Sequence, residues 1–210
     1  MTEAHEAATG AQPTRAERRR RSEAAILKAA TTVFAETGYD RTTIRAVAQR
    51  AGVDPALVMQ HFASKERLFA AATEQTVPTD SLLDADIDGL SEAALDHAFA
   101  PFEDPELRAQ AEALLRSSLT HPAALKVLRD DVMVPVQTRL AANLGDQDAA
   151  LKAALLNASM LGVVTARYLL DIPALAEADI GDLRRLLLPA LDALLETSDR
   201  DDPARPGGES

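Results

Sequence analysis

The residues best equipped for chemistry in this sequence are cations and hydrogen-bonding side chains near its beginning. Arg15 is followed by a run of four arginines, and further polar side chains lie between residues 42 and 65. Guanidinium, ammonium, hydroxyl and amide groups bind phosphates and the edges of nucleobases. The chemistry that they indicate is the binding of a polyanion. The run consists of Arg18, Arg19, Arg20 and Arg21.

Charge is unevenly distributed along the 210 residues, whose formal net charge is -11. Residues 1–70 hold 11 of the 22 Lys and Arg but only 8 of the 33 Asp and Glu, a net charge of +3. Because salt limits the reach of exposed charges to about 10 Å at 0.1 M, a basic head can bind a polyanion while an acidic body orients its approach. A short Arg cluster on a solvated acidic surface is the plainer interpretation.

The chain lacks residues that several classes of protein require. The chain has no Cys, which excludes disulfides, zinc ribbons, iron–sulfur clusters and thiol nucleophiles. Its four His are scattered, and no Gly-rich phosphate loop or local nucleophile–base pair is present. We therefore predict no catalytic residue, no metal ligand and no cofactor. The first 25 residues are polar, and the longest uncharged stretch, Ala153–Ala166, is shorter than the ~20 residues of a membrane span. A soluble, cytoplasmic protein without a membrane partner is expected.

The elements that position these residues are predicted to be helices. Aromatic residues are only 3% and Trp is absent, so the core must be mainly Ala and Leu, which favours an all-α fold. Gly38 and Gly52 should end helices, Ser64 should begin one, and Pro135 and Pro189 should kink or interrupt theirs. The expected helices cover residues 14–37, 44–51, 55–62, a segment after Ser64, 91–102, 105–119, 122–144, 149–171 and 180–196.

Residues 42–65 carry the most informative pattern. Two short helices are separated by Gly52 and by a capped restart at Asp54-Pro55, which is the signature of a helix-turn-helix. The turn is too short for antiparallel packing, so the helices must cross steeply and the second is presented outward to a major groove. The same geometry also occurs as plain packing. The outward residues should be Pro55, Ala56, Leu57, Met59, Gln60 and His61.

The stretch TTIRAVAQRAGVDPALVMQHFASKERLF resembles the DNA-binding domain of the TetR family of bacterial repressors. The resemblance covers about residues 20–72. Met59 stands where the family usually has Tyr, and a Gly common near Ala56 is missing. Met59 cannot donate a hydrogen bond to phosphate, but it could pack on a thymine methyl group or a sugar. The matching residues are Phe34, Gly38, Tyr39, Thr42, Thr43, Ile44, Val47, Ala48, Ala51, Gly52, Val53, His61, Phe62, Lys65 and Leu68.

The chemistry of each candidate DNA contact suggests its role. The Thr42-Thr43 pair, at a helix N-terminus, offers hydroxyl and backbone N–H groups to phosphate, and Lys65 adds a point charge at another N-terminus. Arg45 could reach phosphate or guanine, Gln60 could pair with adenine, and His61 could touch the DNA backbone. The alternative for each is a solvated surface residue.

The arginine run is unfavourable for an isolated helix, because cations at a helix N-terminus oppose the macrodipole by about 0.3–1 kcal/mol each. An external anion such as the DNA backbone resolves this conflict. The alternative is that the first turn frays into a solvated arm. An arm that is disordered alone and becomes ordered on DNA would satisfy both interpretations.

The resemblance implies two domains. Residues 15–76 would form an N-terminal three-helix DNA-binding domain with the helix-turn-helix, and residues 77–197 a helical bundle that binds an effector and dimerises, with the linker at Val77–Gly89. Residues 1–14 and 198–210 are expected to be a disordered arm and tail.

Two helices near the C-terminus predict a dimer seam. Residues 149–170 are apolar nearly all round and must be buried on all sides, and the last helix carries a wide Leu-rich stripe. The resemblance also implies a homodimer, and an intramolecular core is the alternative. The predicted interface residues are Leu155, Leu183, Leu187, Leu191 and Leu194.

Polar residues among the Ala and Leu of the second domain could line a mostly apolar effector pocket, although such groups are more often satisfied core or surface residues. The candidates are Arg116, Thr120, His121, Asn157, Thr165 and Tyr168. The leading hypothesis is a homodimeric transcriptional repressor that a small apolar effector releases from its operator. A sequence-independent architectural DNA-binding protein and a helical-bundle enzyme are the alternatives.

Overall fold

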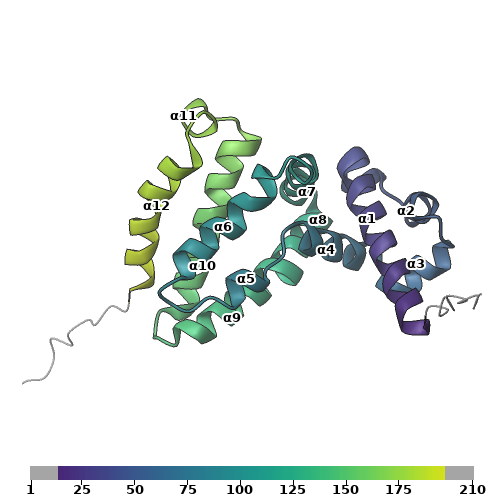
Figure 1. Cartoon of the computed structure of the whole chain (residues 1–210), viewed down its shortest axis with the longest axis horizontal. Coiled ribbons are helices and arrows are strands. Elements are labelled where there is room, and N and C mark those ends of the chain that lie inside the picture. Colours follow the sequence, from purple (N-terminus) through teal and green to yellow (C-terminus); the bar gives the residue numbers. More distant parts are fainter. Residues whose placement is uncertain (1–13, 197–210) are drawn as a thin grey trace, which may run out of the picture.

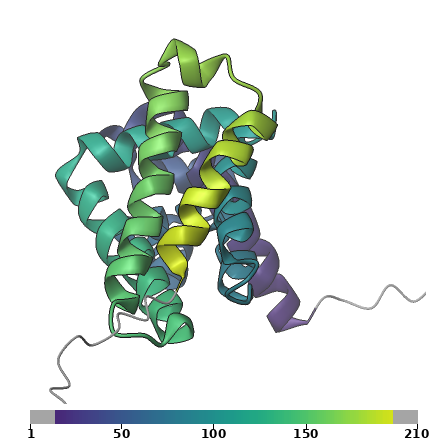
Figure 2. The ribbon, with the colours of Figure 1, turned by 90° about the vertical axis from the view of Figure 1, so that its left-hand side faces the viewer.

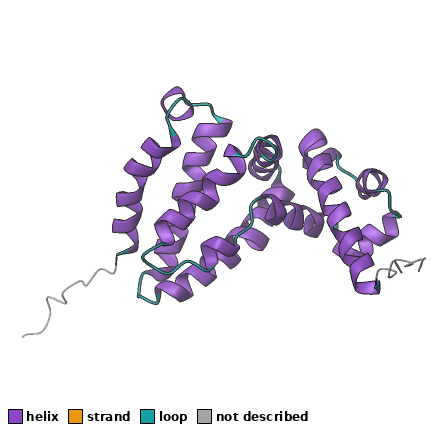
Figure 3. Ribbon diagram, in the orientation of Figure 1, coloured by secondary structure: helices purple, strands orange, loops and turns teal. Residues whose placement is uncertain are grey.

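The structure is a computed structural model that describes residues 14–196, and every regular element in that range is helical (Figure 3). The prediction of an all-α fold is confirmed. Of the expected arm, residues 1–14, only Thr14 is described, and it is the N-cap of α1; the expected tail at 198–210 lies outside the described residues. The α-helices are α1 (Arg15–Arg41), α2 (Ile44–Ala51), α3 (Pro55–Phe62), α4 (Lys65–Thr76), α5 (Asp80–Leu83), α6 (Leu90–Glu103), α7 (Arg108–Thr120), α8 (Pro122–Val127), α9 (Val134–Leu144), α10 (Ala149–Val164), α11 (Pro173–Ala176) and α12 (Ile180–Leu195).

The first four helices pack around an aromatic core. Phe34 of α1 and Phe69 of α4 are fully buried and meet edge to face, with ring centroids 4.9 Å apart. A capping box between Thr14 and Glu17 begins α1, so the arginine run lies in ordered helix. Gly38 interrupts the helical geometry of α1 with φ 76°, close to where the sequence predicts its end.

A second core lies inside the bundle formed by α6, α9, α10 and α12. Leu95, Phe99, Leu140 and Leu156 are among its most deeply buried side chains. In Figure 1 the bundle forms one side of the molecule and α1–α3 the other, with α4, α7 and α8 between them. Figure 2 shows α10 and α12 side by side on the outer face of the bundle.

The joint between the two parts is packed rather than open. Leu114 of α7 and Val127 of α8 belong to the core of the first four helices, α1 packs on α7, and α4 packs on both α7 and α8. The His121 ring lies against the Tyr39 ring, and its Nε2 atom is 2.5 Å from Asp40 Oδ1. The predicted domain boundary at residue 76 therefore separates two segments of the sequence, but the side chains of the two parts pack together across it.

The bundle departs from the expected helices at five places. Short α5 lies within the expected linker, and α11 is not among the expected helices. The expected helix 122–144 contains a π-helical stretch, Leu128–Met133, just before Pro135, and α10 continues into a second, Thr165–Leu169. Pro135 has no N–H to donate to the regular hydrogen bonds of an α-helix. The wider π-helical turn before it accommodates this missing donor. Pro189 does not interrupt α12.

The segment Ala149–Leu169 is the one helix among residues 14–196 long and apolar enough to cross a membrane. It packs instead against α6, α9 and α12. Lys152 is buried within it, and its ammonium lies 2.5 Å from Asp146 Oδ2 and 2.7 Å from the Glu196 carbonyl oxygen. These polar partners come from the bundle itself, so this face of the helix belongs to the bundle core.

Candidate DNA-binding surface and effector cavity

Local interactions of neighbouring residues set the angle between α2 and α3. Thr43 caps α2, because its hydroxyl accepts from the Ala46 N–H. Gly52 ends α2 at φ 68°, where its N–H donates to the Ala48 and Gln49 carbonyls. Asp54 then begins α3 by accepting from the Ala56 N–H at 2.7 Å. The turn and restart that the sequence indicates are thus present.

Helix α3 buries one face and exposes the other. Val58 and Phe62 point into the first core, whereas the predicted outward residues Pro55, Ala56, Met59 and Gln60 are exposed and Leu57 is half-buried. Thr43 and Arg45 are also exposed at the start of α2. The residues that the sequence assigned to base contact are thereby presented together.

The arginine run lies beside the exposed face of α3. Arg15, Arg18 and Arg19 of α1 share a groove of about 390 Å³ with Leu57, Gln60 and His61 of α3 and with Ser22. The side chains of all four arginines are exposed. Guanidinium groups beside the exposed face of α3 are suited to the phosphates that flank a major groove.

Two of the predicted DNA contacts have hydrogen-bond partners within the protein. Thr42 is only 2% exposed, and its hydroxyl is 2.8 Å from both the Thr37 hydroxyl and the Gly38 carbonyl oxygen. The His61 side chain is 5% exposed, 3.1 Å from the Ser22 hydroxyl and near Glu23. Both side chains hold α1 against the helix-turn-helix. Thr42 has almost no exposed surface, and His61 lines the groove beside α3 with only a small part of its side chain exposed. Sequence spacing could not show this, because their partners lie on α1.

Lys65 is engaged within the protein. Its ammonium donates to the Asp40 carbonyl at 3.1 Å and lies 4.5 Å from the centre of the Tyr39 ring. Burial lowers the pKa of Lys65 from its ordinary value, against the opposing effects of Asp40 and Glu66. A phosphate at the N-terminus of α4 would add to these partners or replace them.

We expect that replacing all four arginines of the run with glutamine weakens DNA binding without lowering the unfolding temperature. Exposed guanidinium groups that bind phosphate release counterions, so the slope of log affinity against log salt should become shallower by about 1 for each phosphate that is no longer bound. Removing cations from a helix N-terminus does not harm the helix. DNA titration at several salt concentrations and thermal unfolding measure the two effects, with Arg139→Gln on the exposed surface of α9 as the control. Unchanged affinity would refute the role of the run.

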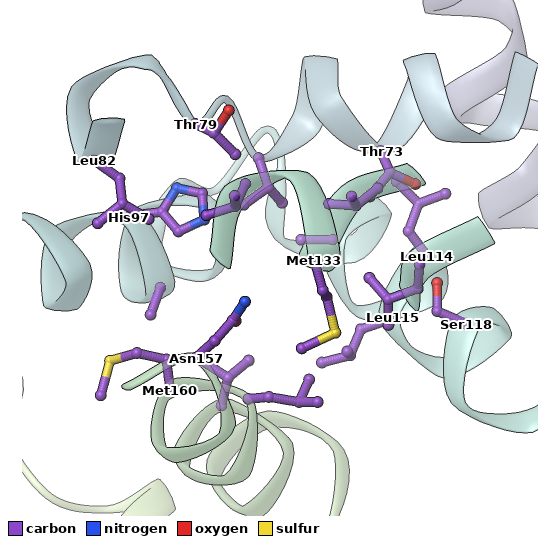
Figure 4. Close-up of a pocket in the computed structure, with 18 of the residues that line it drawn as sticks. Thr73, Thr79, Leu82, His97, Leu114, Leu115, Ser118, Met133, Asn157 and Met160 are labelled. Carbon is purple, nitrogen blue, oxygen red and sulfur yellow. The ribbon is translucent and has the colours of Figure 1, made fainter. Parts of the chain in front are cut away.

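A cavity of about 140 Å³ opens between the ends of α4 and α6 and helices α7 and α10 (Figure 4). The π-helical stretch contributes Leu128, Val132 and Met133 to its wall. Thr73 and Val77, at the end of α4, line the same space, so the cavity contacts the helix that carries Lys65. The polar residues of the lining are Thr73, Thr79, His97, Ser118 and Asn157.

Only Asn157 of the six predicted pocket residues lines this cavity. Arg116 and Thr120 are exposed on α7, and His121 pairs with Asp40. The Tyr168 hydroxyl bonds to Glu103 and its ring stacks on Phe102, while Thr165 is half-buried in the second π-helical stretch. The structure therefore places these five outside this cavity, and their role in effector binding stays a prediction. A polar residue in an apolar helix was too broad a signal, since most such groups are satisfied elsewhere in the core.

His97 is a polar residue of the cavity that was not among the predicted pocket residues. Its Nδ1 atom lies 3.0 Å from the Pro78 carbonyl oxygen, and burial lowers the pKa of its imidazole despite that hydrogen bond. A carbonyl oxygen only accepts, so Nδ1 carries the proton in the neutral ring and Nε2 is the acceptor. The position of His97 within apolar α6 was the available signal.

The apolar outer face of the bundle differs from the predicted seam. Leu183 and Leu191 are 7% and 3% exposed in the chain's own core, which leaves them little surface for a partner, and Leu187 and Leu194 pack partly against that core. Leu155 alone is exposed as predicted. Exposed apolar stripes at helical spacing instead run along α10 and α12, which are adjacent. They comprise Leu151, Leu155, Ala158 and Gly162, and Leu186, Pro189, Ala190 and Ala193.

Comparison with known families identifies the class of protein. The model of the tetR family of bacterial regulatory proteins matches residues 26–72, and that of the tetracyclin repressor-like C-terminal domain matches residues 88–195. A reading head and a helical bundle of these kinds define a sequence-specific DNA-binding regulator of transcription. The chain belongs to the TetR family of bacterial regulators.

Individual relatives agree with this assignment. An HTH-type transcriptional repressor of Mycobacterium tuberculosis is 47% identical over 51 residues, which cover 24% of this chain and 27% of that protein. The match thus spans about a quarter of the curated relative. A TetR-family regulator of Streptomyces coelicolor is 27% identical with a TM-score of 0.59, covering 89% of this chain and 98% of that one. SmeT, solved as a triclosan complex, is 26% identical with a TM-score of 0.59, covering 83% and 90%.

Proposed function

We propose that the protein is a homodimeric repressor that binds a two-fold symmetric operator and is released by a small molecule. The observation that carries DNA binding is the groove shared by Arg18, Arg19 and Gln60, which joins phosphate-binding cations to the exposed face of α3. The Mycobacterium tuberculosis relative, named a transcriptional repressor, supports the direction of regulation. The cytoplasm, where bacterial DNA lies, is the place where we expect it to act.

The dimer is supported by the two exposed apolar stripes on α10 and α12. A monomer that kept Leu151, Leu155 and Leu186 in water would expose a contiguous apolar face. The same patch on a second copy would cover it in an isologous two-fold interface. Ala158 and Gly162 would allow the facing helices to approach closely. Two reading heads related by the same axis would then match two half-sites about one helical turn or somewhat more apart.

Release of the protein from its operator would act through a movement of α4. Thr73 and Val77 of this helix line the cavity, and its N-terminal Lys65 contacts Asp40 at the end of α1. A ligand that fits the cavity better in one arrangement of α4 shifts the separation of the two heads toward that arrangement. The TetR fold of SmeT in its triclosan complex supports a small-molecule ligand for the related domain here.

Selection of duplexes from a random library tests the proposed function. We expect a palindromic sequence to bind far more tightly than scrambled DNA, whereas an architectural protein would show little preference. Light scattering on the complex should show two chains on each duplex.

Gln60→Ala should relax the preference at particular base pairs of that operator by about 1–3 kcal/mol, because an amide pairs bidentately with adenine. Lys65→Ala should instead weaken binding to all sequences alike. Gln75→Ala, on the exposed surface of α4, is the matched control for Gln60. Titration against every single-base variant of the operator measures both effects. A changed base preference in the Lys65 variant with no change in salt dependence would contradict these roles.

A further inference from the structure

The cavity limits the size and the charge of what it can hold. Its volume of about 140 Å³ is close to that of an engineered cavity of about 150 Å³ that binds benzene, so the matching ligand has the bulk of one small ring. None of the described residues that line it is Asp, Glu, Lys or Arg. A charged group placed there would lose its water and gain no counter-charge, which opposes its binding.

Two side chains at one end of the cavity specify the polar part of the ligand. His97 is held by the Pro78 carbonyl in the tautomer that keeps Nε2 as an acceptor. Asn157 reaches from α10 into the space, where its amide can donate, and Figure 4 shows it and the His97 ring on the same side of the cavity. One group that donates to imidazole and accepts from an amide N–H satisfies both, and a hydroxyl does so.

We propose that this cavity binds an uncharged, single-ring molecule whose hydroxyl donates to His97 Nε2 and accepts from the Asn157 side-chain amide. The assignment rests on the proposed function, because it names the effector class of the same cavity. Met133 and Leu115 line the side of the cavity opposite His97 and Asn157, and Met160 lines it beside Asn157. Unbranched thioether side chains adapt to irregular apolar shapes, so they would accept methyl or halogen substituents on the ring.

Three compounds of nearly equal shape test the ligand class on the full-length protein in the absence of DNA. Calorimetric titration would compare 4-methylphenol with 1,4-dimethylbenzene, which lacks the hydroxyl, and with the anion 4-methylbenzoate. We expect one 4-methylphenol per chain, about tenfold or more weaker binding of 1,4-dimethylbenzene, as the loss of hydrogen bonds predicts, and weaker binding still of the anion. Equal binding of the first two, tighter binding of the anion, or no binding of 4-methylphenol would overturn the assignment.

Substitutions of two lining residues test whether the ligand binds in this cavity. Asn157→Leu and His97→Phe should each reduce the preference for 4-methylphenol over 1,4-dimethylbenzene while leaving the binding of 1,4-dimethylbenzene within a few-fold of wild type. Asn143→Leu, at an exposed position on α9, is the control and should keep the full preference. Thermal unfolding without ligand checks that the variants are folded. If they do not fold, the three-compound comparison on the wild type still decides. An undiminished preference in folded variants would contradict the site.

Operator titration in parallel separates this inference from the proposed function. If 4-methylphenol binds as expected but the operator stays bound, the release mechanism fails and the ligand class stands. If the protein binds a specific operator but not 4-methylphenol, the ligand class fails and the proposed regulator stands.

Discussion

Replacing Leu155 and Leu186 together with aspartate is expected to convert the dimer into a folded monomer. These side chains are 44% and 64% exposed in the single chain, so the core of the monomer stays intact when they become charged. In the dimer they would bring uncompensated charges into an apolar seam across the two-fold axis. Operator affinity should fall by at least about a hundredfold, because the second reading head is no longer tethered to the first. Light scattering, circular dichroism and DNA titration measure the three effects.

Two further substitutions make this result specific. Leu125→Asp, at an exposed position on α8, should leave the dimer intact. Leu191→Asp should unfold or aggregate the chain instead of releasing a folded monomer, because that side chain is buried in the bundle core. A wild type that is monomeric at micromolar concentration, or a double variant that stays dimeric, is incompatible with the proposed seam.

Lys152→Met is expected to destabilise the protein by about 3–5 kcal/mol, the range for removing one partner of a buried ion pair. The Lys152 ammonium binds the Asp146 carboxylate at 2.5 Å, the Glu196 carbonyl at 2.7 Å and the Leu195 carbonyl at 3.4 Å. Without it, Asp146 is a mostly buried carboxylate with no counter-charge, and the end of α12 loses its donor. A fall of about 10 °C in unfolding temperature follows for a chain of this size.

The effect should depend on burial rather than on the ion pair as such. Lys126→Met removes a similar pair, Lys126 with Asp130 at 2.6 Å, from an exposed surface and should change the unfolding temperature little. Adding Asp146→Asn to Lys152→Met should recover part of the loss, because no buried charge then remains unpaired. Equal effects of Lys152→Met and Lys126→Met would show that the buried network does not contribute as argued.

The helix-turn-helix is the part of this protein that the sequence by itself determined. Helix α3 spans Pro55–Phe62 as predicted, and Gly52, Asp54 and Ser64 end or begin helices where their residue types indicate. These interactions join residues two to four positions apart, so the amino-acid types and their spacing specify them without knowledge of the rest of the chain. The all-α class followed in the same way from helical periodicity and the scarcity of aromatic residues.

The tertiary structure alone decided which faces and partners the remaining residues have. The Leu-rich stripe of α12 is wider than the core needs, and only the packing against α6 and α10 buries Leu183 and leaves Leu186 exposed for the proposed seam. Thr42 and His61 match the spacing of DNA contacts but are held by residues of α1. His97 and Asn157 are 60 positions apart in the sequence and line one cavity because the bundle packs α6 against α10. Such contacts depend on the three-dimensional packing of distant segments, which residue spacing along a single helix does not encode.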